Sequence, residues 1–229
     1  MRQMKRYALY YAPRPGAFAD FAAAWLGWDA AKGRPAAHPD LGELPVPIAE
    51  LTAEPRKYGF HGTLRAPFRL ADGLEPATLA TKVEGLAQRL PPVVCQDLVL
   101  QDLHGFVALI PRGNDQGVRA LAQEVVRVSN AWRAPLTPAE IARRRPETLT
   151  ARQRDLLIEW GYPFVMEAFQ FHLTLTGKLD PDIAATVRTV LEQTLAPLLP
   201  LPFAIEDLCL FGEDAEGRCH LLHRYPLLG

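Results

Sequence analysis

Apolar residues recur along the chain with two spacings, and each spacing predicts a different kind of element. Short runs rich in aromatic and β-branched residues, bounded by proline, glycine or aspartate, are typical of strands. They predict strands over residues 5–13, 57–68, 92–103, 105–113, 169–179, 201–211 and 218–227. Residues 29–56 contain five prolines and are expected to form a long loop.

Apolar residues three and four positions apart predict helices. These helices cover residues 16–28 and 75–90, a segment capped by Asn114 or Asp115, and a segment that begins at Pro181. Capping boxes indicate two further helices, because Thr137 precedes Glu140 by three residues and Thr150 precedes Gln153 in the same way. The two capped helices, over about 137–145 and 150–160, form a helical insertion at 134–168.

One order of elements occurs twice in the chain. From residue 57 and again from residue 169, a strand containing His-x-Thr is followed by an amphipathic helix and two strands. We therefore expect an α+β protein with two similar lobes around a central cleft, each an antiparallel-rich sheet packed with helices. The first lobe would cover 1–133 and the second 169–229, with the insertion at 134–168 between them and exchange of terminal strands between lobes allowed.

The repeated strands read KYGFHGTLRAPF and FQFHLTLTGKL. Side chains two positions apart share one face of a strand. The polar residues that share a face are therefore His61, Thr63 and Arg65 in the first strand, and His172, Thr174 and Thr176 in the second. The competing interpretation is that both motifs are ordinary strand residues whose polar groups satisfy local hydrogen bonds.

Two histidines and two threonines suit phosphodiester cleavage. Histidine serves as base or acid near neutral pH, so His61 and His172 on opposite sides of a phosphate would supply both roles. The hydroxyls of Thr63 and Thr174 can donate hydrogen bonds to the non-bridging oxygens, where negative charge accumulates. The sequence leaves open which histidine is the base and which is the acid.

Four other residues are candidates for substrate binding. Arg65 would add a fixed positive charge beside His61. Tyr58 adjoins the first motif, although only a twist or bulge would aim it inward. Tyr10 would supply a stacking wall, with core packing as its alternative fate, and Thr176 would add a further hydroxyl on the His172 face.

Composition narrows the classes of function. The chain has 229 residues, is 48% hydrophobic and has a formal net charge of −1, which argues against a broad DNA- or RNA-binding surface. Three cysteines without Cys-x-x-Cys spacing make disulfides and a zinc site unexpected, so we expect no metal and no cofactor. We find no apolar stretch of membrane-spanning length and no secretory signal pattern, so a cytoplasmic location is expected.

The motifs also resemble those of a known family, the two-histidine phosphoesterases, which includes RNA 2′,3′-cyclic phosphodiesterases and 2′-5′ RNA ligases. The segments RYALYYAP, WLGWD, KYGFHGTLRAPF and RPETLTARQRDLLIEWGYPFVMEAFQFHLTLTG resemble its phosphonate-metabolism branch. The resemblance implies a bilobed fold with pseudo-twofold symmetry, metal-independent phosphodiester or cyclic-phosphate chemistry, and a phosphonate-operon setting. One departure is Gly62, where alanine is expected.

Three functions follow as hypotheses. The leading one is a hydrolase acting on a small phosphorylated molecule, such as the cyclic phosphate of a ribose derivative from phosphonate breakdown. The second is RNA end processing at 2′,3′-cyclic or 2′-5′ linkages, which the charge and the lack of a basic, aromatic-rich stripe disfavour. The third is a non-catalytic phosphate-binding protein, which would not need an acid and a base together.

We further expect the insertion at 134–168 to overhang the site as a lid, with packing on the outer face of one lobe as the alternative.

Overall fold

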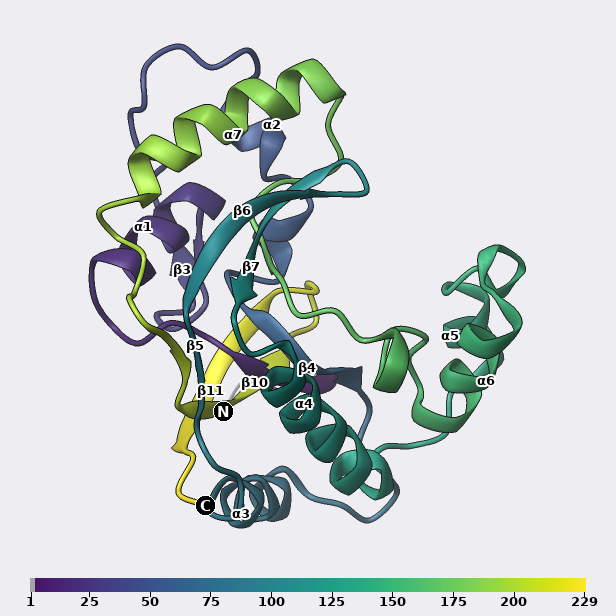
Figure 1. The fold of residues 1–229 in the computed structure, drawn as a ribbon. Coiled ribbons are helices and arrows are strands. Elements are labelled where there is room, and N and C mark those ends of the chain that lie inside the picture. The colour runs from purple at the N-terminus through teal and green to yellow at the C-terminus, as the bar shows by residue number, and fades with distance from the viewer. Residues whose placement is uncertain (1–2) are drawn as a thin grey trace.

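The computed structural model describes residues 3–229 and is built on one seven-stranded sheet (Figure 1). Neighbouring strands are antiparallel throughout, in the order β11-β10-β1-β4-β8-β7-β6. The strands are β1 (Arg6–Tyr11), β4 (Gly62–Phe68), β6 (Asp97–Leu103), β7 (Phe106–Arg112), β8 (Leu173–Thr174), β10 (Asp207–Glu213) and β11 (Cys219–Pro226). Two small sheets pair β2 (Trp28–Asp29) with β3 (Arg34–Pro35) and β5 (Val93–Cys95) with β9 (Phe203–Ile205). The α+β class predicted from the sequence is confirmed.

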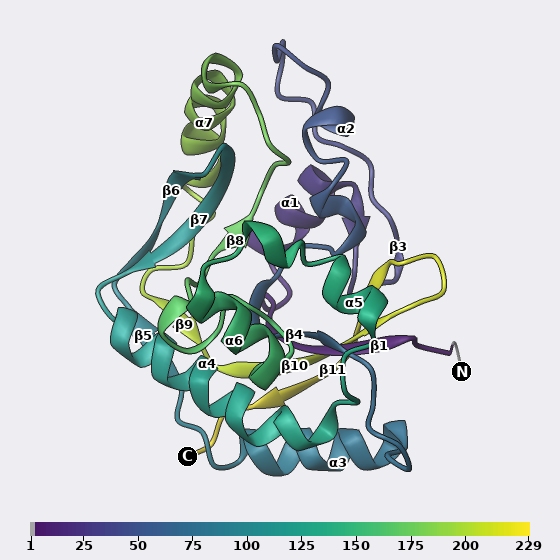
Figure 2. The same cartoon turned by 90° about the vertical axis from the view of Figure 1, so that its right-hand side faces the viewer.

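Helices cover the two ends of this sheet. The α-helices are α1 (Ala17–Leu26), α2 (Ile48–Leu51), α3 (Pro76–Ala87), α4 (Asp115–Ser129), α5 (Pro138–Ala142), α6 (Ala151–Trp160) and α7 (Pro181–Leu195). Short 3-10 turns are η1 (Pro55–Lys57), η2 (Asn130–Trp132), η3 (Pro146–Thr148) and η4 (Met166–Ala168). Helices α3 and α4 lie side by side beneath β10, β11 and β4, whereas α7 packs on β6 and β7 (Figure 2). None of the helices within residues 3–229 has the length and apolar character needed to cross a membrane.

The element order repeats, as the sequence predicted, but the two halves exchange strands. The series β1-α1-β4-α3-β5-β6 is followed by β7-α4-β8-α7-β9-β10. In the sheet, β1 lies between β10 and β4, and β7 lies between β6 and β8. The C-terminal strands β10 and β11 therefore belong with β1, and β6 and β7 belong with the second motif. The half β11-β10-β1-β4 draws on both ends of the chain, whereas the half β8-β7-β6 draws on its middle. Strands are therefore exchanged between the expected lobes at 1–133 and 169–229, as that expectation allowed.

The apolar stripes explain why the helices form where they were expected. The buried residues of α4 are spaced three and four apart, and they include Val118, Leu121 and Val125. The side chain of Asn114 caps this helix by accepting a hydrogen bond from the Gly117 backbone N–H. Both capping boxes of the insertion also form, at Thr137 and Thr150.

The second motif strand is shorter than predicted. Only Leu173–Thr174 form β8, although the sequence pattern extends over 169–179. Beyond Thr174 the backbone leaves the regular ladder, since the N–H groups of Leu175 and Thr176 both donate to the Val107 carbonyl. The first motif strand also begins late, at Gly62, because the turn η1 and a positive φ of +67° at Gly59 occupy the preceding residues.

Candidate active site

The two motifs meet where β4 and β8 pair. Gly62 lies opposite Leu173 in an antiparallel register. Extending this register by one residue in each direction places His61 opposite Thr174, and Thr63 opposite His172. Leu173 is fully buried in the main core, so the four motif residues point to the opposite face of the sheet. The two histidines are thus diagonal neighbours, a relationship that spans about 7–8 Å between Cα atoms in regular sheets. A separation of roughly 5–8 Å between the imidazoles, which an acid–base pair around one phosphate requires, remains a prediction.

Both imidazoles are oriented in the same way. The Nδ1 atom of His61 lies 2.9 Å from the Gly59 carbonyl oxygen, and the Nδ1 atom of His172 lies 3.0 Å from the Gln170 carbonyl oxygen. A carbonyl only accepts, so each Nδ1 carries the proton and each Nε2 presents a lone pair. The Thr63 Oγ1 lies 3.2 Å from the Nε2 atom of His61. Within residues 3–229, neither the Nε2 atom of His172 nor the hydroxyl of Thr174 has a hydrogen-bond partner.

Aromatic rings support both histidines. The Tyr10 ring stacks on the His61 imidazole, with centroids 3.9 Å apart and planes inclined by 21°. Phe106 lies beside His172, with ring centroids 5.6 Å apart. Tyr10 is 2% exposed, and its ring packs behind the His61 imidazole and positions it, so the alternative of core packing describes most of this side chain; stacking on a substrate remains a prediction.

Burial lowers the pKa of both histidines. For His61 the pKa falls to about 4, chiefly because burial penalises the cation and also because His172 is nearby, while the Gly59 carbonyl acts in the opposite direction. Burial likewise lowers the pKa of His172, against a smaller opposing effect of the Gln170 carbonyl. Both rings are therefore neutral near pH 7.

Two cavities meet at His61 and Thr174, and His172 is not among the residues that line them. The first, of about 400 Å³, we call the arginine cavity, and the second, of about 410 Å³, the lysine cavity. Both are lined by Tyr58, His61, Tyr162 and Thr174. The arginine cavity is further lined by Arg6, Tyr10, Thr63, Ala66, Pro67, Leu136, Glu140, Arg143, Arg144 and Gly161. The lysine cavity is further lined by Glu54, Pro55, Gly59, Phe106, Thr176, Gly177 and Lys178. Tyr58 therefore lies at the junction of the two cavities, and its role in substrate binding remains a prediction.

The insertion at 134–168 forms one wall of the arginine cavity. Its contributions are Leu136, Glu140, Arg143, Arg144, Gly161 and Tyr162. This position agrees with the expected overhang and not with packing on an outer face. Sequence analysis missed Tyr162 and the two arginines as site residues, because no periodicity connects a helical insertion with a strand motif elsewhere in the chain.

Arg65 does not reach the site, which corrects the expectation of a substrate contact. Its side chain is 2% exposed and lines only a crevice of about 20 Å³ next to the arginine cavity. A register shift between β1 and β4 places Arg65 opposite Leu9, a core residue, and so breaks its alternation with Thr63. The Nη1 atom of Arg65 donates to the Trp160 carbonyl at 2.7 Å. Burial and the neighbouring Arg133 lower its pKa to about 9.

The hydroxyl of Thr176 is also committed elsewhere. It accepts from the Val107 N–H at 2.9 Å and donates to the Gly177 carbonyl at 2.8 Å. Thr176 is 1% exposed. It lines the lysine cavity but holds the backbone beyond β8 and has no remaining donor for a substrate, contrary to expectation.

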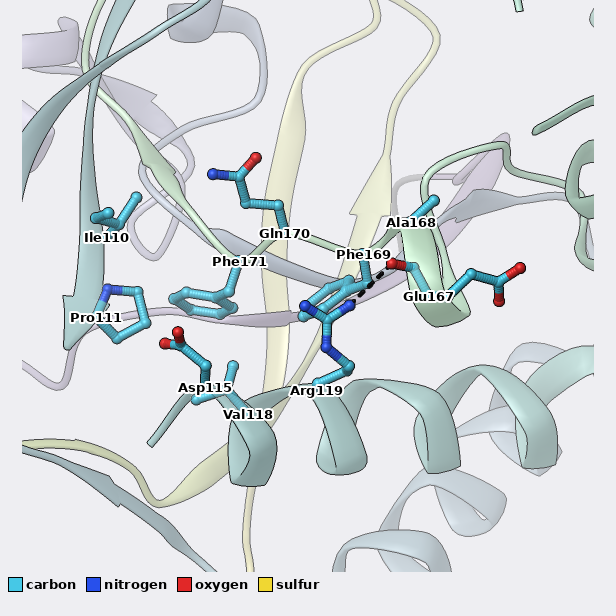
Figure 3. A pocket seen from close by; sticks show the side chains of 10 residues that line it. All are labelled: Ile110, Pro111, Asp115, Val118, Arg119, Glu167, Ala168, Phe169, Gln170 and Phe171. Atoms are coloured by element: carbon cyan, nitrogen blue, oxygen red, sulfur yellow. Dashed lines mark hydrogen bonds between the residues drawn. The ribbon is translucent and has the colours of Figure 1, made fainter. Parts of the chain in front are cut away.

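A third cavity, of about 410 Å³, lies between α4 and the segment that precedes His172 (Figure 3). Arg119 of α4 spans it and donates to the Glu167 carbonyl at 3.0 Å. Gln170 and Phe171 line the same cavity. Neither His61 nor His172 lines this cavity. The hydrogen bond from Arg119 holds the segment whose Gln170 carbonyl orients His172.

The described residues offer no ready metal centre. Within residues 3–229 there is no group of three or more His, Cys, Asp and Glu side chains arranged to hold an ion. The absence of a preformed ion site does not show whether the reaction needs a metal, so metal-independent catalysis remains a prediction.

Fold and site together define an α+β protein whose internal repeat brings two His-x-Thr motifs to one strand pair. The chain belongs to the family described as a protein of unknown function, DUF1045, whose model matches residues 63–220.

Two curated relatives are named ribose 1,5-bisphosphate phosphokinase PhnN. The relative from Janthinobacterium sp. (strain Marseille) is 36% identical over 220 residues, 93% of this chain and 49% of the relative. The relative from Laribacter hongkongensis (strain HLHK9) is 38% identical over 221 residues, 96% of this chain and 51% of the relative. The chain thus spans about half the length of these curated relatives.

Solved structures with a similar arrangement are more distant in sequence. Escherichia coli LigT in complex with 3′-AMP is 15% identical, with a TM-score of 0.45 and coverage of 99% of this chain and 100% of that chain. TT0787 of Thermus thermophilus is 15% identical, with a TM-score of 0.45 and coverage of 98% of each chain. Because the sequence identity to these structures is only 15%, the assignment of a function depends on the residues of this chain.

Proposed function

We propose that this protein is a metal-independent phosphoesterase that hydrolyses a small cyclic phosphate or phosphodiester. One observation carries the proposal: two histidines on paired strands are held by equivalent backbone carbonyls with both Nε2 atoms unprotonated. His61 lines both of the cavities that meet beside Thr174, and His172 is its diagonal neighbour across the pair of strands β4 and β8. A binding protein needs hydrogen-bond donors for an anion, whereas this arrangement presents a base and a potential acid.

The residues perform the reaction as follows. Entry of the anionic phosphate favours protonation of one histidine, because the negative charge offsets the penalty of burial. His172 takes this proton and becomes the acid, since His61 is the more strongly desolvated ring. The Nε2 atom of His61 removes a proton from water, whose oxygen attacks phosphorus. The bond from phosphorus to the leaving oxygen breaks, and the Nε2–H of His172 protonates that oxygen.

The threonines stabilise the charge that develops during this step. The Thr174 hydroxyl faces both cavities and is available as a donor to a non-bridging oxygen. The Thr63 hydroxyl, which contacts His61 Nε2 in the free protein, turns to the phosphate when that nitrogen engages water. Each such donor in a preorganised site is worth about 2.7–4 kcal/mol in the transition state.

The substrate we propose is a ribose-derived cyclic phosphate formed during phosphonate breakdown. Cavities of about 400 Å³ suit a small ligand and fall at the lower end of ligand-binding pockets. The curated relatives bear the name of an enzyme that acts on a ribose phosphate, which supports this class of substrate. Their kinase activity is not proposed here, because the sequence contains no G-x-x-x-x-G-K-[ST] phosphate-binding loop.

A panel of substrates tests the proposal. Ribose cyclic phosphates, nucleoside 2′,3′-cyclic phosphates and a 2′-5′-linked dinucleotide are incubated with the protein, with and without EDTA. We expect turnover of a cyclic phosphate that survives EDTA and falls at least about 100-fold in His61→Gln and His172→Gln, the usual contribution of an acid or base. His223→Gln is the matched control, because His223 lies on β11, away from the paired strands β4 and β8 that carry the two motifs. Turnover restored only by a divalent ion would overturn the metal-independent mechanism, and preferred turnover of the dinucleotide would favour RNA end processing.

A further inference from the structure

We propose that the arginine cavity is a subsite for a second phosphate group, bound by Arg143 and Arg144 of the insertion. This inference rests on the proposed function and specifies its substrate class: a cyclic phosphate that carries a separate phosphomonoester. The cyclic phosphate lies beside His61 and Thr174, and the monoester lies at the two guanidinium groups. Both ends of the ligand lie in one continuous cavity, since Arg143, Arg144, His61 and Thr174 line the same space.

The charges in this cavity do not cancel. Three arginines and one carboxylate line it. Arg6 is paired with Glu213 at 2.5 Å, so its charge is already compensated. Glu140 is also engaged, because the guanidinium of Arg69 donates to both of its oxygens at 3.0 Å. The Arg69 contact and the Thr137 cap lower the Glu140 pKa to about 2, so this carboxylate remains with Arg69.

Arg143 and Arg144 are the cations left without a counter-charge. Within residues 3–229 neither has a salt-bridge partner, whereas the next residue, Arg145, pairs with Glu147. The Arg144 guanidinium lies over the Tyr162 ring, 4.8 Å from its centroid, and Tyr162 lines the same cavity. This cation–π contact orients Arg144 along the cavity wall without neutralising its charge.

The wall that carries these arginines is firmly anchored. Backbone N–H groups of Arg143 and Arg144 donate to the carbonyls of Ala139 and Ile141 at the end of α5. The insertion is joined to β4 by the bond from Arg65 to the Trp160 carbonyl, and to the chain just after β4 by the Arg69–Glu140 pair. Two guanidinium groups on a fixed support match a phosphate dianion, which accepts several charge-assisted hydrogen bonds.

The experiment compares ligands that differ by a single phosphate. Ribose cyclic phosphate and its 5-phosphorylated form are assayed with the wild-type protein and with Arg143→Gln/Arg144→Gln. We expect the wild type to prefer the phosphorylated form by at least about 100-fold in kcat/KM, as two charge-assisted contacts imply. In the double variant this ratio should fall to about ten or less. Arg145→Gln is the matched control and should keep the wild-type ratio, because Arg145 lies outside the cavity lining.

A binding measurement separates the subsite from catalysis. Ribose 5-phosphate titrated calorimetrically into the protein should bind the wild type and Arg145→Gln, and bind the double variant at least about tenfold more weakly. Equal turnover of the two cyclic phosphates by the wild type would overturn the subsite while leaving the proposed function intact. Retention of the preference in the double variant would also overturn it. No turnover of any cyclic phosphate would overturn the proposed function itself.

Discussion

The ring of Phe171 occupies the space into which a side chain at position 62 would extend. A Cβ atom built on Gly62 would lie 2.2 Å from Cζ of Phe171, closer than any real contact allows. Phe171 directly precedes His172 and contacts Tyr11 and Phe203 in the core. Glycine within the first motif, where the family resemblance leads one to expect alanine, is therefore required by packing beneath the second motif.

Substituting Gly62 should reduce the stability of the protein. In Gly62→Ala the methyl group must displace the Phe171 ring, so we expect a loss of about 1–3 kcal/mol in the free energy of unfolding, as for other overpacked cores. Urea denaturation measures this loss. Gly85→Ala is the control, because Gly85 lies in α3 and its nearest neighbour would be 3.9 Å away. That variant should gain stability, since alanine favours a helix over glycine. Equal stability of Gly62→Ala and the wild type would show that Phe171 has room to move.

The pH profile of catalysis should reflect the lowered pKa values of the two histidines. The reaction needs one neutral and one protonated ring, so kcat/KM rises above the lower pKa and falls above the higher one. Because the His61 pKa is about 4 and burial also lowers that of His172, the maximum in kcat/KM should lie below pH 6.5. A bound phosphate raises both pKa values, so the maximum in kcat should lie at higher pH. Initial rates measured across roughly pH 3.5–9 give both profiles. A kcat/KM maximum above about pH 7.5 would contradict the burial argument.

Removing the Arg65 charge should loosen the insertion without abolishing substrate binding. Arg65→Met keeps the volume but loses the hydrogen bond to Trp160, at a cost of about 1–2 kcal/mol that relief of a buried charge partly offsets. We expect KM to change less than about threefold, whereas loss of a direct charge contact with phosphate would change it at least about tenfold. Limited proteolysis should cleave the variant faster within 134–168. Arg112→Met, which removes an exposed pair with Asp97, should be digested like the wild type.

The ring of Tyr162 should limit the size of the substrate. It lies at the junction of the two cavities together with Tyr58, so Tyr162→Ala merges them into a larger space. We expect kcat/KM for a 2′-5′-linked dinucleotide to rise about fivefold or more relative to that for a minimal cyclic phosphate, in line with selectivity set by pocket shape. Ile158→Ala, on the exposed side of α6, provides the control. Unchanged selectivity in Tyr162→Ala would show that the insertion is not a lid.

Local patterns predicted the longer helices well because the information lies within each helix, whereas the short α2 lies in the segment 29–56 that was expected to be a loop. The apolar stripe of α4 and the capping boxes at Thr137 and Thr150 need no distant partner to be recognised. The shared face of His61 and Thr63 was predictable for the same reason, since a regular strand fixes it. The strand order was not, because pairing of β10 with β1 depends on contacts between opposite ends of the chain.

Two predicted substrate-binding residues, Arg65 and Thr176, were placed wrongly because the strands are irregular at these positions. Arg65 follows strict alternation in the sequence, but the register shift against β1 sends it into the interior. Thr176 lies where the ladder beside β7 has already ended, so its hydroxyl serves the backbone. Arg144 and Tyr162 gained their place in the site through the docking of the insertion, which no local pattern encodes.

Because the two halves exchange strands, both motifs are synthesised before β10, the strand that supports the first of them. His61 is supported by Tyr10 of β1, and Tyr10 in turn packs against Phe211 of β10. A chain still emerging from the ribosome therefore possesses both motifs well before the strand that steadies the first of them. Until β10 arrives, one edge of β1 is unpaired, and closing this long-range contact is intrinsically slow. A product that ends before β10 would therefore carry both motifs but lack the strand against which Tyr10 packs, and we expect its His61 imidazole to be poorly positioned.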